Sequence, residues 1–188
     1  MNQELINWMQ NRVANGAVGP STIRGMVPAG TAGKIKDYLR KWDIKTIRAH
    51  SEGDFLKKLD AVTDGLLNAL PHDAKHWGMA RKCVNIFLRN CLYNRYLCKH
   101  YKLEPLEEWL EIPLDSHTGK GLIIHFEKGM LPRWRTVISL TREESSQFQR
   151  AALDLAKKKR VCRIHLDDFL YQGEHVTRVS PTIPPKLS

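Results

Sequence analysis

The stretch HWGMARKCVNIFLRN, residues 76 to 90, decides the fold because it predicts a helix with apolar residues around much of its circumference. The apolar pattern continues beyond it, so we expect a long central helix from about residue 78 to residue 100. Arg81 and Lys82 nevertheless stand side by side within it. Long cationic side chains are rarely placed in an apolar helix unless they reach water, an acidic partner or a polyanion. The question is which of these Lys82 contacts.

Composition predicts a single domain that binds an acidic partner. The chain has 188 residues, of which 42% are hydrophobic, and this is enough to bury a core without a second chain. Its 30 Lys and Arg against 20 Asp and Glu give a net charge of +10. A protein this basic usually meets a polyanion, and nucleic acid is the first candidate. The alternative is a basic surface that only keeps the protein in solution.

Cysteine usage and the N-terminus bear on metal sites and location. Three of the four cysteines, Cys83, Cys91 and Cys98, fall in the expected central helix at spacings that suit core packing. No pair has the C-x-x-C spacing of a zinc site or the tight runs of an iron–sulfur cluster, so we expect no metal and no cofactor. Residues 1–12 lack the apolar core of a signal peptide, and no stretch reaches membrane-spanning length. We therefore expect free thiols and a cytoplasmic monomer without a membrane partner.

Periodic patterns predict further helices. Residues 54–70 carry an apolar stripe at three- and four-residue steps, with charged residues on the opposite face. Thr141 is followed three residues later by Glu144, and this capping-box pattern predicts the start of a second helix. A further apolar segment contains Gly119 and Gly121, which we expect to interrupt any helix that forms there.

The remaining segments complete a mainly α fold. Strand signals are scarce, since only residues 121–126 and 135–140 contain short β-branched runs. Glycine and proline cluster in residues 15–34, which we expect to form a loop region or short elements. Residues 1–173 are expected to form one helical domain. The tail, residues 174–188, is rich in proline and is expected to be disordered.

Two segments carry a recognisable pattern: a helix ending in Leu-Pro leads to a helix that begins with Arg-Lys, and an apolar-Asp-Ser-His segment follows later. The residues concerned are Leu70, Pro71, Arg81, Lys82 and Asn85, and then Leu114, Asp115, Ser116 and His117. A third segment, RIHLDDFLYQG at residues 163–173, closes the pattern. Together they resemble the catalytic core of the helix-hairpin-helix DNA glycosylases, nearest to the archaeal 8-oxoguanine DNA glycosylase branch. The likeness covers residues 55–173, the implied catalytic core, and leaves residues 1–54 unmatched.

The resemblance implies a two-lobed helical domain with a remodelled helix-hairpin-helix. The segment HDAKHWGMA, with Gly78 as its single glycine, replaces the compact Gly-x-Gly hairpin of common members. The implied activity is that of a DNA glycosylase, which flips a base out of double-stranded DNA into a pocket and excises it to leave an abasic site. Residue-for-residue matching puts Lys82 at the nucleophile position, where it would also support AP-lyase strand nicking, and Asp115 at the catalytic carboxylate.

The chemistry explains why these two residue types are needed together. Breaking an N-glycosidic bond builds positive charge on the sugar, which a nearby carboxylate such as Asp115 stabilises. An amine attacks only when it is neutral, whereas a free lysine amine has a pKa of about 10.4, so burial and adjacent positive charge would have to favour the neutral form. Alternatively, Lys82 holds DNA while a water molecule attacks. Asp115 could also be a helix N-cap, a role compatible with catalysis.

Seven further residues are candidates for contacts with DNA or with the flipped base. They are Trp77, Gly78, Arg81, His117, Trp134, His165 and Asp168. The structural alternatives are core packing for each tryptophan, support of the aspartate loop for the first histidine, and capping or ion pairing for the last two residues. The basic run at residues 157–160 is usually a solvated helix end, but on a DNA-binding protein it could contact phosphates.

The sequence leaves the substrate open. The resemblance implies an oxidised purine such as 8-oxoguanine, which would make the protein a repair enzyme. A hypermodified base of foreign, phage DNA is the alternative substrate, and the role would then be antiviral defence. A third interpretation belongs to another class of protein, a non-catalytic nucleic-acid-binding module on the same scaffold.

Overall fold

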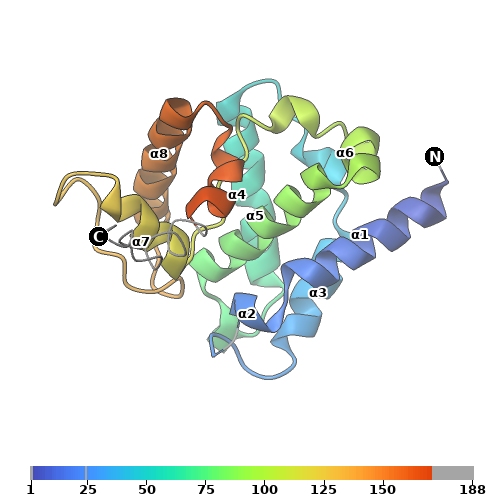
Figure 1. Cartoon of the computed structure of the whole chain (residues 1–188). Coiled ribbons are helices and arrows are strands. Elements are labelled where there is room, and N and C mark those ends of the chain that lie inside the picture. Colours follow the sequence, from blue (N-terminus) through green and yellow to red (C-terminus); the bar gives the residue numbers. More distant parts are fainter. Residues whose placement is uncertain (1, 24, 171–188) are drawn as a thin grey trace, which may run out of the picture.

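The structure of the protein is a computed structural model that describes residues 2–23 and 25–170 (Figure 1). No strand is found in these residues, so the mainly α fold is confirmed. The α-helices that lie wholly within them are α1 (Gln3–Ala17), α2 (Pro20–Ile23), α3 (Thr31–Lys41), α4 (Glu52–Asn68), α5 (Trp77–Tyr93), α6 (Arg95–Tyr101), α7 (Ser116–Ile124) and α8 (Arg142–Lys159). Single 3-10 turns are η1 (Ile44–Ile47), η2 (His72–Ala74), η3 (Glu104–Leu106) and η4 (Arg163–His165), and residues 166–170 are helical. The tail expected to be disordered lies outside the described residues.

Two helices form where their sequence patterns predict them. The predicted helix at 54–70 is α4, which begins at Glu52 because the Ser51 hydroxyl accepts the Asp54 N–H. The predicted capping box starts α8, since the Thr141 hydroxyl accepts the Glu144 N–H at 3.1 Å and the Glu144 carboxylate accepts the Thr141 N–H at 3.1 Å. These reciprocal bonds satisfy N–H groups that have no partner within the helix.

The expected long helix at 78–100 is two helices, α5 and α6, which meet at Asn94. The backbone of Asn94 is extended, and its side-chain oxygen accepts the N–H groups of Tyr96 and Leu97, each at 3.1 Å. An asparagine that caps the next helix offers the backbone an alternative to continuing the previous one. The apolar periodicity carries across this break, which is why it predicts one helix.

The expected interruption of the helix at Gly119 is absent, because α7 passes through both of its glycines. A Cβ atom at Gly119 would lie 2.2 Å from the ring of Trp134, so the glycine serves the close approach of that ring to the helix. Of the two β-branched runs, the first belongs largely to α7 and the second, residues 135–140, is irregular. Of the described residues in 15–34, the first three end α1, the last four begin α3, and the short helix α2 lies between them. Gly25 and Gly30 have φ values of 71° and 81°.

Two hydrophobic clusters form the core of the described residues. The larger contains buried residues of α1, α3, α4, α5 and α6, and the smaller contains those of α7, α8 and the segment between them. Helix α5 contacts α1, α3, α4, α6 and α8, and Figure 1 shows it running between α7 and α8 on one side and α1 to α3 on the other. The N-terminal half of α5 is therefore placed where elements of both clusters meet.

Candidate functional site

The Lys82 side chain contacts an acidic partner. Its Nζ atom lies 3.3 Å from Oδ2 of Asp115 and 3.5 Å from the backbone oxygen of Thr22. Lys82 is 5% exposed, and it comes from α5, whereas Asp115 immediately precedes α7. The two residues that the resemblance pairs are thus adjacent in space, although a long connector separates them in the sequence.

Asp115 has two distinct roles, one for each oxygen. Its Oδ1 atom accepts the N–H groups of His117 at 2.9 Å and Thr118 at 3.1 Å, while the Thr118 hydroxyl accepts the Asp115 N–H at 2.8 Å. Asp115 is therefore the N-cap of α7, as one alternative predicted. Oδ2 is left to face Lys82. The cap fixes the carboxylate in one orientation, so capping and a role at the site are combined in one side chain.

The surroundings of Asp115 favour its ionised form. Burial raises the pKa of the carboxyl, but the Lys82 ammonium and the two backbone N–H groups of Thr118 and His117 lower it by more. The net result is a pKa below the usual value for aspartate. Asp115 is thus a carboxylate at neutral pH, the form that can stabilise a cationic sugar.

A cavity of about 290 Å³ opens beside this ion pair, and we call it the Lys82 cavity. Its lining residues are Met26, Lys82, Asp115, Ser116, His117, Thr136, Val137 and Ile138. Of the candidates from the sequence, Lys82, Asp115 and His117 are brought together here. Met26 and the segment 136–138 were not predicted, because nothing in their local pattern indicates that they approach the aspartate loop.

Arg81 contacts different acidic residues from its neighbour Lys82. Its guanidinium lies 2.9 Å from Glu111 and 2.9 Å from Asp60, and it donates to the Thr63 hydroxyl at 2.9 Å. The side chain is 6% exposed, and Glu111 is 7% exposed. Arg81 is thus held within the protein by a buried ion pair.

Trp77 and Gly78 stand at the start of α5, outside the lining of the Lys82 cavity. The Trp77 ring is flanked by the guanidinium groups of Arg81 and Arg142, at 5.2 and 5.4 Å from its centre, and it lines a separate cavity of about 370 Å³. Gly78 is buried, and a Cβ atom there would lie 2.2 Å from the backbone oxygen of Val137. The glycine therefore lets α5 approach the segment that forms one wall of the Lys82 cavity.

The other candidates occupy varied positions. Trp134 is 7% exposed, packs edge-on against Phe148, and its indole N–H lies 3.4 Å from the Ser116 hydroxyl, so it belongs to the core beneath the aspartate loop. His165 contacts Glu107, Asp168 is exposed, and neither lines the Lys82 cavity. The basic run at 157–160 is the exposed end of α8, as the simpler alternative predicted.

Comparisons with known proteins give no match. No protein-family model, no curated protein and no solved structure is similar to this chain. No helix in the described residues is long and apolar enough to span a membrane. What the Lys82 cavity does must therefore be inferred from its own chemistry.

Proposed function

We propose that the protein is a DNA glycosylase that flips a base out of double-stranded DNA and excises it, with associated AP-lyase nicking through Lys82. The observation that carries this proposal is the 3.3 Å separation of Lys82 Nζ and Asp115 Oδ2 at the wall of a cavity. A buried amine beside an oriented carboxylate is the pair of groups that N-glycosidic bond cleavage needs. The site residues of the proposed enzyme are these two, with His117 beside them.

Asp115 would stabilise the transition state. As the bond between sugar and base breaks, the sugar becomes cationic, and a carboxylate already fixed by two backbone N–H groups needs no reorganisation to face that charge. The cap at the start of α7 therefore supports a catalytic role for Asp115 rather than competing with it.

Lys82 would attack after losing its proton. In the ion pair it is an ammonium, and the nearest acceptor for its proton is Asp115. When DNA covers the cavity and excludes water, a neutral amine and carboxylic acid are easier to bury than two charges. The amine would then form a bond to the anomeric carbon while the base departs with the electron pair of the broken bond. The base takes the proton from Asp115, which is therefore a carboxylate again as positive charge develops on the sugar. The bond between the anomeric carbon and the ring oxygen then breaks, and the oxygen takes the electron pair and a proton from the nitrogen, which gives a Schiff base. Loss of a proton from C2′ and of the 3′-phosphate from C3′ nicks the strand.

The charge and dimensions of the molecule support DNA as the substrate. The net charge of +10 favours a polyanion. Exposed Arg135 directly precedes Thr136, which lines the Lys82 cavity, and exposed Arg133 lies two residues before Arg135, so cations are available for phosphates near the site. The volume of about 290 Å³ is close to the lower limit of small-molecule pockets, roughly 300 Å³. Such an enzyme would act as a monomer in the cytoplasm, on a two-lobed glycosylase fold.

Two substrate classes follow from the proposal, an oxidised purine and a hypermodified base of phage DNA. The test is to incubate the purified protein with duplexes that carry normal, oxidised, deaminated, alkylated or hypermodified bases, and to score strand breaks with and without alkali. Breaks on one class without alkali are expected, and they would identify the substrate and the role, repair or defence. An absence of breaks on every duplex, despite salt-sensitive binding, would leave a non-catalytic binding module.

One observation favours a second mechanism on the same site. Because Lys82 is ion-paired, it could remain an ammonium and bind a phosphate, while Asp115 activates a water molecule. Breaks would then appear only after alkali treatment. Replacing Lys82 with alanine would leave base release largely intact in this mechanism and would abolish nicking in the first.

A further inference from the structure

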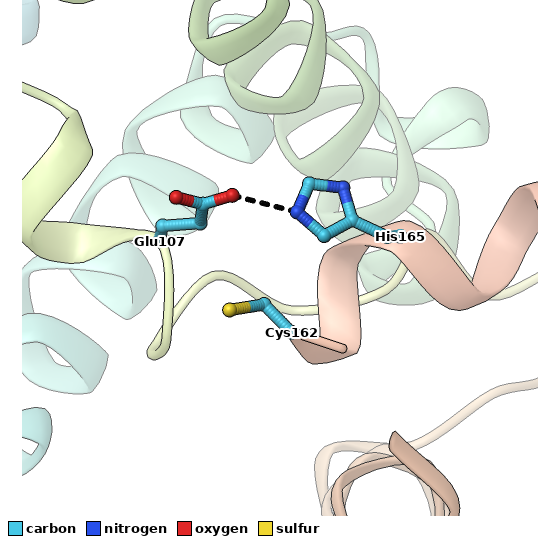
Figure 2. Close-up of side chains that lie close together, drawn as sticks. All are labelled: Glu107, Cys162 and His165. Carbon is cyan, nitrogen blue, oxygen red and sulfur yellow. Dashed lines mark hydrogen bonds and ion pairs between the residues drawn. The ribbon is translucent and has the colours of Figure 1, made fainter. Parts of the chain in front are cut away.

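Three potential metal ligands meet where the segment after η3 lies beside η4. The carboxylate of Glu107, the thiol of Cys162 and the imidazole of His165 have ligand atoms that all lie within 4.8 Å of one another. Figure 2 shows the Cys162 sulfur below the line that joins the Glu107 carboxylate to the His165 ring. We call these residues the Glu107–Cys162–His165 cluster. None of them lines the Lys82 cavity.

The histidine is oriented as a metal-binding histidine usually is. Its Nε2 atom points at Glu107, with 2.6 Å to Oε1, and its Nδ1 atom lies 2.8 Å from the Tyr93 hydroxyl. The Tyr93 and His165 rings are also stacked, with their centres 5.6 Å apart. Metal-bound histidines almost always bond a second group through the other ring nitrogen, which fixes the tautomer and the ring orientation. Tyr93 supplies that second group here.

The surroundings favour a cation, in a chain that is otherwise strongly basic. Glu108 acts on Cys162, and Asp168 acts on Tyr93, whose hydroxyl contacts His165. Glu107, Glu108 and Asp168 therefore place negative charge near the thiol or near Tyr93, with Arg89 as an opposing cation at Tyr93, and a divalent cation would reduce the repulsion among the carboxylates.

We propose that the Glu107–Cys162–His165 cluster binds a zinc ion through three protein ligands. Thiolate, imidazole and carboxylate together are the ligand set of Zn²⁺, and three such ligands leave the fourth tetrahedral position for water. Access from solvent is available, because the side chains of His165 and Glu107 are 27% and 33% exposed. A surface depression of about 630 Å³, lined by Tyr93 and Glu107, adjoins the site.

Binding requires a small adjustment and the loss of one proton. Ligand nitrogen and oxygen atoms on a tetrahedral zinc are roughly 3.3 Å apart, so the Glu107 carboxylate must move away from Nε2 by less than one bond length. The Cys162 thiol releases its proton to solvent as the zinc–sulfur bond forms. The proton between His165 Nε2 and Glu107 moves to Nδ1, which then donates to the Tyr93 hydroxyl. The ion would then tie the turn after η3 to η4, two segments that are far apart in the sequence.

The experiment uses cobalt as a spectroscopic substitute for zinc on the full chain. After chelator treatment, Co²⁺ is added and the visible and near-ultraviolet spectra are recorded. We expect intense d–d bands of a tetrahedral site and a thiolate-to-cobalt charge-transfer band, both removed by Zn²⁺ in a one-to-one titration. A spectrum of hydrated cobalt only, without the thiolate band, would overturn the proposal.

Matched variants identify the ligands. Cys162→Ser and His165→Ala should remove the thiolate band or the tetrahedral spectrum, and Tyr93→Phe should weaken zinc binding by about tenfold. Cys98→Ser is the control, because Cys98 is also partly buried and close to Glu104, yet it lies outside the cluster. Persistence of the band in Cys162→Ser, or its loss in Cys98→Ser, would overturn the assignment. Since the readout is binding alone, it is independent of whether the Lys82 cavity excises a base.

Discussion

Lys82 and Asp115 lie 3.3 Å apart at their charged atoms, and they join elements of two different hydrophobic clusters. Lys82 belongs to α5, which packs in the larger cluster, and Asp115 caps α7, which packs in the smaller. The cavity beside the pair is lined by residues from both sides, including Met26 and Val137. A ligand that moves Lys82 and Asp115 apart will therefore also change the packing between the two hydrophobic clusters.

Substitutions of Lys82 and Asp115 test the nucleophile and the carboxylate separately. We expect Lys82→Ala to abolish strand nicking and borohydride trapping of a protein–DNA adduct, because no other group would supply the amine. Asp115→Asn should lower base release by roughly 10²–10⁴-fold, since it removes the charge that stabilises the sugar cation. Lys120→Ala, an exposed lysine of α7, is the control and should behave as the wild type. Trapping that persists in Lys82→Ala would exclude Lys82 as the nucleophile.

The stability contribution of Asp115 should depend on pH. Because the folded-state pKa of Asp115 is lowered, its charge stabilises the fold above the unfolded pKa of about 3.9, and this contribution is lost as pH falls through the folded pKa. Asp115→Asn keeps a good N-cap but removes the charge, so the free energy of unfolding should drop by roughly 1 kcal/mol at pH 7. Denaturant titrations should show the difference vanish near the acid limit. An equal loss at every pH would contradict this account.

The buried ion pair of Arg81 should matter more for stability than that of Lys82. Arg81→Met leaves Glu111 buried without its ion-pair partner, and Glu111→Gln leaves Arg81 paired with the half-exposed carboxylate of Asp60. Each single change should cost about 3 kcal/mol in unfolding free energy. The double variant should lose clearly less than the sum, because it removes both charges of the pair together. Additive losses in a double-mutant cycle would show that the two side chains act independently.

Gly78→Ala tests the close packing of α5 against the cavity wall. The new methyl group would lie 2.2 Å from the Val137 backbone oxygen and 2.7 Å from the Leu140 Cβ, so backbone must move. We expect a loss of about 1–3 kcal/mol in thermal or denaturant unfolding, together with weaker activity because Val137 lines the Lys82 cavity. Gly53→Ala in α4 is the control, since nothing lies within 4 Å of its Cβ position. That variant should be as stable as the wild type or slightly more so.

Arg135 is expected to contact a phosphate rather than a base. It is exposed and precedes Thr136, which lines the Lys82 cavity. Arg135→Ala should weaken binding to all duplexes similarly and reduce the slope of log affinity against log salt by about one. Lys99→Ala is the control, because α6 lies well away from α7 (Figure 1). A change in sequence preference without a change in slope would contradict this role.

Local chemistry explains what the sequence could predict. The helices α4 and α8 are marked by an apolar stripe and a capping box, which depend only on neighbouring residues. The Asn94 side chain could lie within one continuous helix or cap a new one, and the apolar spacing is the same in both cases. The sequence therefore does not predict the break between α5 and α6. Gly119 was expected to interrupt a helix, but its role depends on Trp134, a residue of a later segment.

The candidate site likewise depends on contacts between distant segments, which the sequence alone does not predict. Lys82 and Asp115 were paired through a resemblance, because the residues themselves do not indicate their proximity. Arg81 pairs with Glu111 and Asp60. These two residues come from separate segments, and no sequence pattern marks either as a partner of Arg81. The spacing Cys162-x-x-His165 is visible in the sequence, but two ligands alone do not predict a metal site. The third ligand, Glu107, comes from another segment and is placed beside them only by the fold.

Adjacent positions on a helix differ by about 100° of rotation, and α5 uses this offset to direct Arg81 toward Glu111 and Lys82 toward Asp115. Inserting one residue after Gly78 would turn both cations away from their partners while leaving every functional residue in the chain. The number of residues between the glycine held against Val137 and the two cations is therefore as constrained as their identity. Point substitutions can remove one ion pair at a time, whereas a change of length in this single turn removes both together.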